Sequence, residues 1–135
     1  MGTDSESKPR VLIVDDEAPL LQLMSRFVGQ LGYDVEVTST GRQAWDVFAR
    51  DPSSFRLVIA DLTLPDMAGQ ELLRQMLEAN PALRILVCSG YPANPGTFGD
   101  GAVAGFLQKP FLPRMLEQAV RSLMQRESGP ADSTK

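Results

Sequence analysis

Histidine is absent from this chain of 135 residues, and cysteine occurs once, as Cys88. The lack of histidine excludes an imidazole general base, a histidine metal ligand and an imidazole pH switch. A lone cysteine excludes a disulfide within the chain and a zinc site of several cysteines, and it fits a reducing compartment. No apolar run approaches the roughly 20 residues that cross a bilayer, and the first residues show no apolar signal-peptide core. We therefore expect a cytoplasmic protein, with no membrane segment in this chain.

An excess of positive charge is also missing. Lys and Arg number 13 against 17 Asp and Glu, so the net charge of −4 gives no support for direct binding of nucleic acid. With 43% hydrophobic and 22% charged residues, the composition is that of one ordinary folded domain. We expect this domain over residues 9–125, between polar tails at 1–8 and 126–135.

Two kinds of apolar segment alternate along the chain. Unbroken aliphatic runs are typical of strands that are buried on both faces of a sheet. Three such runs and two shorter strand patterns occur, at Val11–Val14, Tyr33–Val37, Leu57–Ala60, Leu83–Cys88 and Gly105–Leu107. Between and after them, apolar residues recur at helical spacing. Strands that alternate with helices over short loops predict an α/β fold with a doubly wound, five-stranded parallel sheet.

Several residues mark helix boundaries. Pro19 suits a first helical turn and Gly32 suits a helix end, while Thr40 and Gln43 have the spacing of a capping box. The stretch before the last strand is rich in proline and glycine, which oppose a long helix. We expect Tyr91–Ala104 to be a mobile loop or a short turn of helix, so that the fourth helix is short, displaced or missing.

Polar residues follow four of the five predicted strands, at the edge where open parallel sheets bind ligands. They are Asp15, Asp16 and Glu17 after the first strand, Asp61 after the third, Ser89 after the fourth and Lys109 after the fifth. Clustered carboxylates need a compensating cation, and such oxygen ligands suit Mg²⁺. A carboxylate can attack phosphorus, while Mg²⁺, an ammonium group and a hydroxyl stabilise the transferred group. The set therefore indicates an aspartate that accepts a phosphoryl group.

Each of these signals has a structural alternative when it is taken alone. Asp16 or Glu17 could cap the following helix, and Ser89 could belong to a simple turn. Lys109 could be a solvated surface charge. Their joint occurrence at four strand ends, in this order, favours a shared site.

The sequence resembles the receiver domain of two-component response regulators, including receivers attached to hybrid sensor kinases, over about residues 9–125. The resemblance is carried by Val11–Glu17, Asp61–Glu71, Val87–Tyr91 and Gly105–Phe111. It implies a flavodoxin-like receiver fold with strand order 2-1-3-4-5, and a cis peptide bond between Lys109 and Pro110.

The resemblance also implies the metal and phosphoacceptor residues. Asp61 would be the phosphoacceptor. Asp16, Asp61 and the backbone carbonyl of Thr63 would hold Mg²⁺, and Asp15 would help through water.

Three further residues have implied roles in phosphoryl contact and switching. Lys109 would contact the phosphoryl group and the acidic cluster. Ser89 would be the switch hydroxyl that moves toward the phosphate, and Phe106 would be the aromatic side chain whose rotamer follows it.

The resemblance implies a sensor histidine kinase or a histidine phosphotransfer protein as the partner. Because this chain has no histidine of its own to phosphorylate, the donor would be another protein, another domain or a small acyl phosphate. The domain would then be a phosphoacceptor switch rather than an enzyme with external substrates. The output partner, homodimer formation, and the choice between a free-standing regulator, a piece of a hybrid kinase and a piece of a multidomain regulator stay open.

Three other functions fit less well. An aspartate-nucleophile phosphohydrolase usually has a second aspartate two positions after the first, where this chain has Thr63. A scaffold regulated by binding alone typically loses an acidic or lysine position, and all are present. A nucleotide-binding flavodoxin-like protein would need a Gly- or Ser/Thr-rich phosphate loop after the first strand.

Overall fold

The computed structural model describes residues 8–91 and 102–125, and within them five strands form one sheet. The strands are β1 (Arg10–Val14), β2 (Asp34–Thr38), β3 (Phe55–Asp61), β4 (Arg84–Ser89) and β5 (Val103–Gln108). Their order across the sheet is β2-β1-β3-β4-β5, and every neighbouring pair is parallel. This confirms the predicted α/β class, the doubly wound parallel sheet and its strand order.

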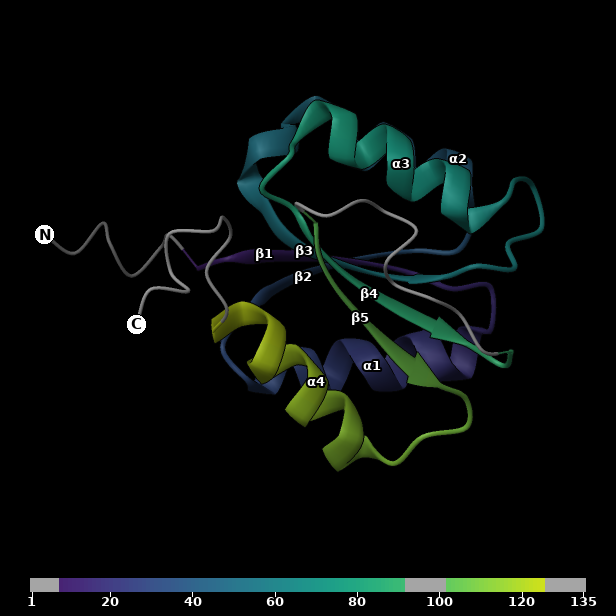
Figure 1. The fold of residues 1–135 in the computed structure, drawn as a ribbon. Helices are drawn as coiled ribbons and strands as arrows, with labels where there is room; N and C mark the ends of the chain where they lie inside the picture. Colours follow the sequence, from purple (N-terminus) through teal and green to yellow (C-terminus); the bar gives the residue numbers. More distant parts are fainter. Residues whose placement is uncertain (1–7, 92–101, 126–135) are drawn as a thin grey trace, which may run out of the picture.

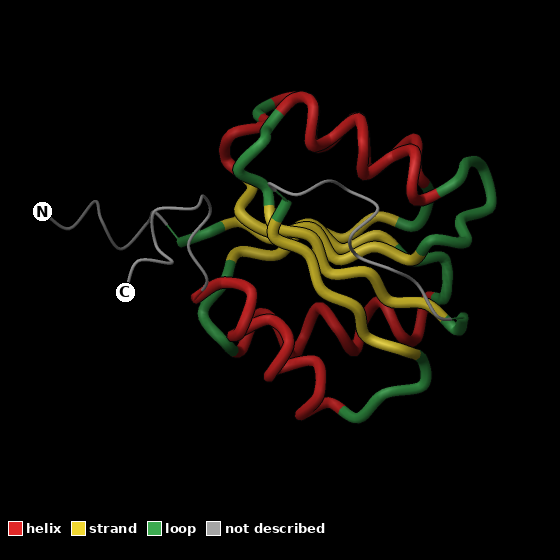
Figure 2. Tube along the Cα trace, in the orientation of Figure 1, coloured by secondary structure: helices red, strands yellow, loops and turns green. Residues whose placement is uncertain are grey.

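Helices cover both faces of the sheet (Figures 1 and 2). They are α1 (Ala18–Gln30), α2 (Gly41–Arg50), α3 (Gly69–Ala79) and α4 (Pro113–Gln125), with a short 3-10 helix at Pro52–Ser54. Figure 1 shows α2 and α3 on one face of the sheet and α1 and α4 on the other. None of the helices within the described ranges is long and apolar enough to span a bilayer.

Strand β1 shows why its sequence is an unbroken aliphatic run. Successive side chains of a strand point to opposite faces. Val11 and Ile13 accordingly belong to the core under α1 and α4, while Leu12 and Val14 belong to the core under α2 and α3. All four are fully buried, so a polar residue at any of these positions would lose its hydration on one face or the other.

The predicted helix boundaries follow from local chemistry. Pro19 lies in the first turn of α1, where its missing N–H has no partner to lose. Gly32 follows the end of α1 with a φ of +103°, a backbone conformation that favours glycine. Thr40 caps α2 by accepting a hydrogen bond from the Gln43 backbone N–H at 3.1 Å. The Gln43 side chain reaches Ser39 rather than Thr40, so only half of the predicted capping box forms.

The last strand is longer than its sequence predicts. Val103 and Ala104, which we expected to lie in a loop, pair with Arg84 and Ile85 of β4 as the first residues of β5. Hydrogen bonding to a fully buried neighbouring strand outweighs the weak strand tendency of this Ala- and Gly-containing stretch. Residues 92–101, and with them the expected short or missing fourth helix, lie outside the described part of the chain.

Candidate functional site

The register of β1 and β3 brings two aspartates together at one edge of the sheet. Val14 pairs with Ala60, so the next residues, Asp15 and Asp61, emerge side by side at the carboxyl ends of adjacent strands. Both are buried, with 1% and 7% of their surface exposed. Two carboxylates at this depth repel each other and need a nearby cation.

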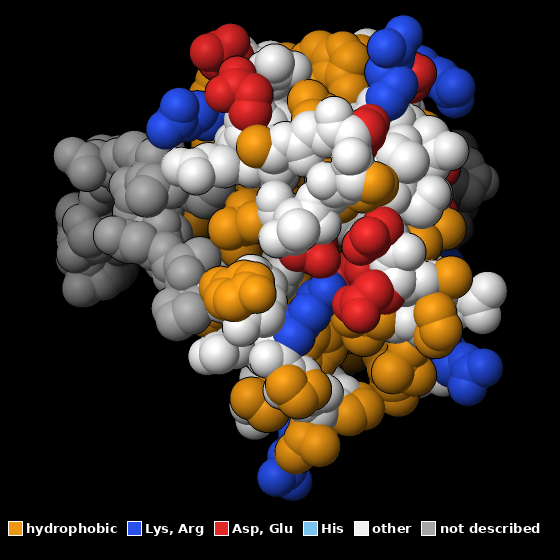
Figure 3. All heavy atoms as spheres, turned by 90° about the vertical axis from the view of Figure 1, so that its right-hand side faces the viewer, with side chains coloured by type: hydrophobic (Ala, Val, Ile, Leu, Met, Phe, Trp, Pro, Cys, Tyr) orange, Lys and Arg blue, Asp and Glu red, His pale blue; other side chains and the backbone are white. Residues whose placement is uncertain are grey.

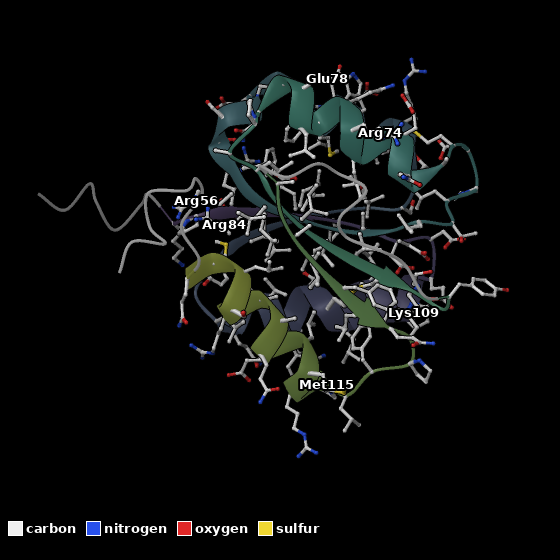
Figure 4. All side chains as sticks on the ribbon, viewed as in Figure 1. Arg56, Arg74, Glu78, Arg84, Lys109 and Met115 are labelled. Atoms are coloured by element: carbon white, nitrogen blue, oxygen red, sulfur yellow. The ribbon has the colours of Figure 1, made fainter. Side chains whose placement is uncertain are left out.

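Strands β4 and β5 add a hydroxyl and an ammonium group to the same edge. Asp61 pairs with Cys88 across β3 and β4, so Ser89 lies one residue further out. Ser89 in turn pairs with Gln108, which places Lys109 directly after β5. Figure 4 shows Lys109 at this edge, far from Arg56 and Arg84 at the opposite end of the sheet. The fold therefore collects the predicted strand-end residues in one place.

Lys109 is the cation that the buried aspartates need. Its Nζ lies 2.9 Å from Asp15 Oδ2, 2.9 Å from Asp61 Oδ2 and 2.8 Å from Glu17 Oε1. Burial opposes the charge on Lys109, but its close contacts with the carboxylates of Glu17, Asp15 and Asp61 outweigh that cost and raise its pKa above the ordinary value. Lys109 is therefore held charged in the centre of the acidic cluster.

Asp15 has an incompletely compensated carboxylate. Its Oδ1 accepts a hydrogen bond from the Glu17 backbone N–H at 2.8 Å. Its buried Oδ2 has the ion pair to Lys109 but no hydrogen bond of good geometry. Burial raises the pKa of Asp15, and the contacts with Lys109 and the Glu17 N–H offset this only in part. A second positive charge beside Asp15 would therefore stabilise the ionised carboxylate.

A divalent cation fits this need. Asp15, Asp16 and Asp61 each offer a carboxylate oxygen, and these oxygens lie within 4.8 Å of one another. Asp16 is exposed, so such an ion would stay open to water on one side. Figure 3 shows acidic side chains gathered beside a basic one on this face of the molecule. Hard carboxylate oxygens with access to water are the ligand set that Mg²⁺ prefers.

The loop after β3 positions the second carboxylate oxygen of Asp61. The Thr63 backbone N–H donates to Asp61 Oδ1 at 3.0 Å. One carboxylate oxygen of Asp61 therefore accepts a hydrogen bond from a backbone N–H, and the other accepts one from the Lys109 ammonium group. Thr63 itself is exposed, and the predicted use of its carbonyl as a metal ligand stays a prediction.

Ser89 is buried, with 2% of its surface exposed. Its Oγ accepts a hydrogen bond from the Tyr91 backbone N–H at 3.1 Å, and its carbonyl accepts one from the Lys109 backbone N–H at 2.8 Å. The Ser89 hydroxyl donates to no acceptor within residues 8–91 and 102–125, so its proton can turn toward an acceptor at the edge. Phe106 is half-buried against the core under α2 and α3, and its predicted switching role stays a prediction.

The peptide bond between Lys109 and Pro110 is cis, as predicted. Beside it lies a cavity of about 530 Å³, lined by Glu17, Pro19, Leu20, Gly90, Lys109, Pro110 and Phe111. A group that reaches the acidic cluster from solvent therefore has a partly apolar recess next to Lys109.

Two contacts were missed in the sequence. Glu17 stands at the N-cap position of α1, but its side chain makes no capping hydrogen bond and pairs with Lys109 instead. Asp66 accepts hydrogen bonds from two backbone N–H groups of α2, which lie 25 and 24 positions earlier in the chain. Local spacing could have suggested Glu17, the third acid in a row, but no local pattern connects Asp66 to α2.

The geometry agrees with comparisons to known proteins. The family model described as "Response regulator receiver domain" matches residues 11–121. The chain is 28% identical over 128 residues to "Sensor kinase CckA" of Brucella abortus, covering 93% of this chain and 14% of that protein. It is 30% identical over 119 residues to "Regulatory protein VanRB" of Enterococcus faecalis, covering 87% of this chain and 53% of that protein.

Solved structures give the same result. The non-phosphorylated HemR receiver domain from Leptospira biflexa superposes with a TM-score of 0.80 at 26% identity, over 91% of this chain and 99% of that one. The chain thus spans almost all of that receiver structure, but only 14% of the sensor kinase and 53% of the regulatory protein. By its sequence match, its strand order and the residues at its carboxyl edge, the chain belongs to the response regulator receiver domain family.

Proposed function

We propose that this domain accepts a phosphoryl group on Asp61 from a phosphohistidine and changes conformation in response. The observation that carries the proposal is the position of Asp61, at a carboxyl strand end with Lys109 Nζ at 2.9 Å and two further aspartates beside it. An isolated helix cap or surface lysine would not need this convergence. Membership in the response regulator receiver domain family supports the same function.

The transfer needs a nucleophile, charge compensation and a leaving group. A carboxylate oxygen of Asp61 attacks phosphorus, a P–O bond forms, and the P–N bond to the donor imidazole breaks. The electron pair of the P–N bond returns to the imidazole nitrogen, and the ring leaves as neutral imidazole because its other nitrogen carries a proton. Lys109 contacts the transferred oxygens, which carry the spread negative charge.

A divalent ion has a defined place in this account. Asp16 and Asp61 would hold it, with the Thr63 carbonyl as the further ligand that the family resemblance implies, and Asp15 would help through water. When bound, Mg²⁺ neutralises charge on the carboxylates and on the phosphoryl oxygens. The incompletely compensated Oδ2 of Asp15 supports this assignment.

Switching would follow from new contacts to the phosphate. A phosphoryl group adds negative charge and acceptor oxygens at the carboxyl edge. Ser89 can donate its hydroxyl to one of them, and Lys109 can follow the added charge. Because Lys109 and Ser89 share a backbone hydrogen bond, a shift of either would move the ends of β4 and β5 together. Phe106 on β5 would repack in response.

The partner implied by this chemistry carries a phosphohistidine. One relative is a sensor kinase and another a regulatory protein, and this chain matches only part of each. We therefore assign the donor as a sensor histidine kinase or a histidine phosphotransfer protein, and we assign no output partner. We place the domain in the cytoplasm, where such donors present their phosphohistidine.

Intact-mass spectrometry after incubation with acetyl phosphate and Mg²⁺ tests the proposal. The wild-type chain should gain one labile phosphoryl group, and Asp61→Asn should gain none. Omission of Mg²⁺ should abolish the adduct in the wild type as well.

A beryllofluoride complex, which mimics the phosphoryl group, covers the case of rapid hydrolysis. Wild type that takes up neither acetyl phosphate nor beryllofluoride would contradict the proposal and favour a scaffold regulated by binding alone. An adduct of equal size on Asp61→Asn would contradict the choice of Asp61.

A further inference from the structure

Asp66 ties the loop after β3 to the start of α2. Its Oδ1 accepts a hydrogen bond from the Gly41 backbone N–H at 2.8 Å, and its Oδ2 accepts one from the Arg42 backbone N–H at 2.9 Å. The hydrogen bonds from Arg42 and Gly41 lower the pKa of this exposed carboxyl. Asp66 is therefore ionised at neutral pH and holds two N–H groups that have no partner inside the helix.

This contact is separate from the ordinary cap of α2. Thr40 already caps the helix locally by accepting a hydrogen bond from the Gln43 N–H. A Cβ at Gly41 would collide with the Met67 side chain, so glycine lets the loop lie directly on the helix end. The start of α2 therefore has two sets of hydrogen bonds. One is made by its own cap, Thr40, and the other by Asp66 in the loop after β3.

The same loop is closed at its base against Asp61. The Gly69 N–H donates to the Leu62 carbonyl at 3.0 Å, and Thr63 forms an antiparallel bridge with Ala68. A Cβ at Gly69 would collide with the Asp61 carbonyl oxygen. Residues 62–68 therefore form a tight loop whose base lies on the backbone of Asp61.

The tip of this loop is bound to α2 and its base carries Thr63, whose N–H donates to Asp61 Oδ1. A short closed loop transmits a displacement at its tip to its base, because few of its torsions are free to absorb it. The carboxylate of Asp61 and the backbone of Thr63 are thus aligned by a chain of contacts that ends at Asp66.

We propose that Asp66 is a positioning residue for phosphoryl chemistry at Asp61, which it aligns by holding the loop of residues 62–68 on the start of α2. The inference rests on the proposed phosphoacceptor function. Within the described residues, the Asp66 carboxylate accepts hydrogen bonds from Gly41 and Arg42 of α2 and from none of the aspartates at the site, so it would act through Thr63. It would then set the rates of phosphoryl gain and loss without changing which residue is phosphorylated.

The test compares Asp66→Ala with Thr40→Ala. Both variants remove hydrogen bonding at the start of α2, but only Asp66→Ala releases the loop. With acetyl phosphate and Mg²⁺, we expect Asp66→Ala to lower the rate constants of phosphorylation and dephosphorylation by about tenfold. Thr40→Ala should stay within about twofold of wild type in both. Asp66→Asn, which keeps one acceptor oxygen, should recover part of the rate.

Amide NMR gives a readout that does not need phosphorylation. The Thr63 amide resonance should shift in Asp66→Ala and stay in place in Thr40→Ala. Rates within twofold of wild type for Asp66→Ala, or an unshifted Thr63 amide, would overturn the inference and leave Asp66 as a helix cap only. If Asp66→Ala does not fold, Asp66→Asn supplies the same two readouts. If the wild type takes up no phosphoryl group, the proposed function fails, and the Thr63 amide still decides whether Asp66 aligns the loop.

Discussion

Glu17 Oε1 lies 2.8 Å from Lys109 Nζ, as close to the ammonium as either buried aspartate. The Glu17 side chain is 60% exposed, whereas that of Asp15 is 1% exposed. Lys109 is therefore shared between a buried acidic pair and one carboxylate at the surface. A phosphoryl group on Asp61 would compete with Glu17 for the same ammonium.

Replacing Glu17 by Gln should accelerate phosphorylation by a small anionic donor. The change removes one negative charge from the approach to Asp61 and frees Lys109 to meet the incoming group. Because Glu17 is exposed and screened by salt, we expect a gain of about threefold at low ionic strength, shrinking as salt is added. The initial rate with acetyl phosphate, measured across a salt series, checks this.

Glu78→Gln is the matched control for Glu17→Gln. It removes the same charge from an exposed position near the end of α3, remote from Lys109 in Figure 4. Equal acceleration by both variants would show that net charge alone matters, and it would refute a specific competition between Glu17 and the phosphoryl group.

Mg²⁺ should stabilise the folded domain against unfolding. At ten times its dissociation constant, a ligand that binds only the native state adds about 1.4 kcal/mol. Thermal unfolding with and without Mg²⁺ measures this gain, and Asp16→Asn should reduce it because it removes a carboxylate from the cluster. An undiminished Mg²⁺ effect in Asp16→Asn would place the ion elsewhere.

Asp15→Asn should raise stability at neutral pH when no metal is present. The pKa of Asp15 is raised by burial, so the native state binds its proton at a higher pH than the unfolded chain does. The contribution of Asp15 to the free energy of unfolding is therefore complete below the pKa that it has in the unfolded chain. It is lost as the pH rises through the higher pKa of the folded state. Urea unfolding measured from pH 4 to pH 7 should show that the free energy of unfolding falls less with pH in Asp15→Asn than in the wild type. The same pH dependence in both proteins would contradict this.

The glycines that begin α2 and α3, Gly41 and Gly69, should differ in their tolerance of a methyl group. Gly69→Ala places a Cβ against the backbone of Asp61 and Leu62, which cannot move without shifting the loop. Gly41→Ala meets Cγ and Sδ of the Met67 side chain, which can change rotamer, rather than backbone. We expect Gly69→Ala to cost about 3 kcal/mol and Gly41→Ala less than half of that, by chemical denaturation. The reverse order would show that the loop yields more readily than Met67.

Cys88 should resist alkylation in the native protein. It is buried, and burial raises the pKa of its thiol to about 12, so almost no thiolate is present at pH 8. Iodoacetamide at pH 8 should modify the thiol in urea but not in buffer. The same rates in both conditions would contradict the burial of Cys88.

The sequence was sufficient to predict five strands and the polar side chains that gather at their carboxyl ends. Residues such as Val11 and Ile59 are apolar because both faces of the sheet are covered, and that pattern is visible without coordinates. Asp61 and Lys109 could be placed together because parallel strands end at a shared edge. The structure adds the partners of each side chain.

Longer-range contacts could not be predicted in this way. Asp66 and Gly41 are 25 positions apart, and no spacing rule connects them. Val103 joins β5 because β4 offers hydrogen bonds, which local propensity does not report. Both depend on tertiary structure that forms around the segment rather than within it.

The central claim is that Asp61 itself carries the phosphoryl group. Borohydride reduces an acyl phosphate to an alcohol, so it converts a phosphorylated aspartate into homoserine. After incubation with acetyl phosphate and Mg²⁺, peptide mass spectrometry should find homoserine at position 61 and at neither Asp15 nor Asp16. Homoserine at one of those two positions, or at none of the three, would contradict the account.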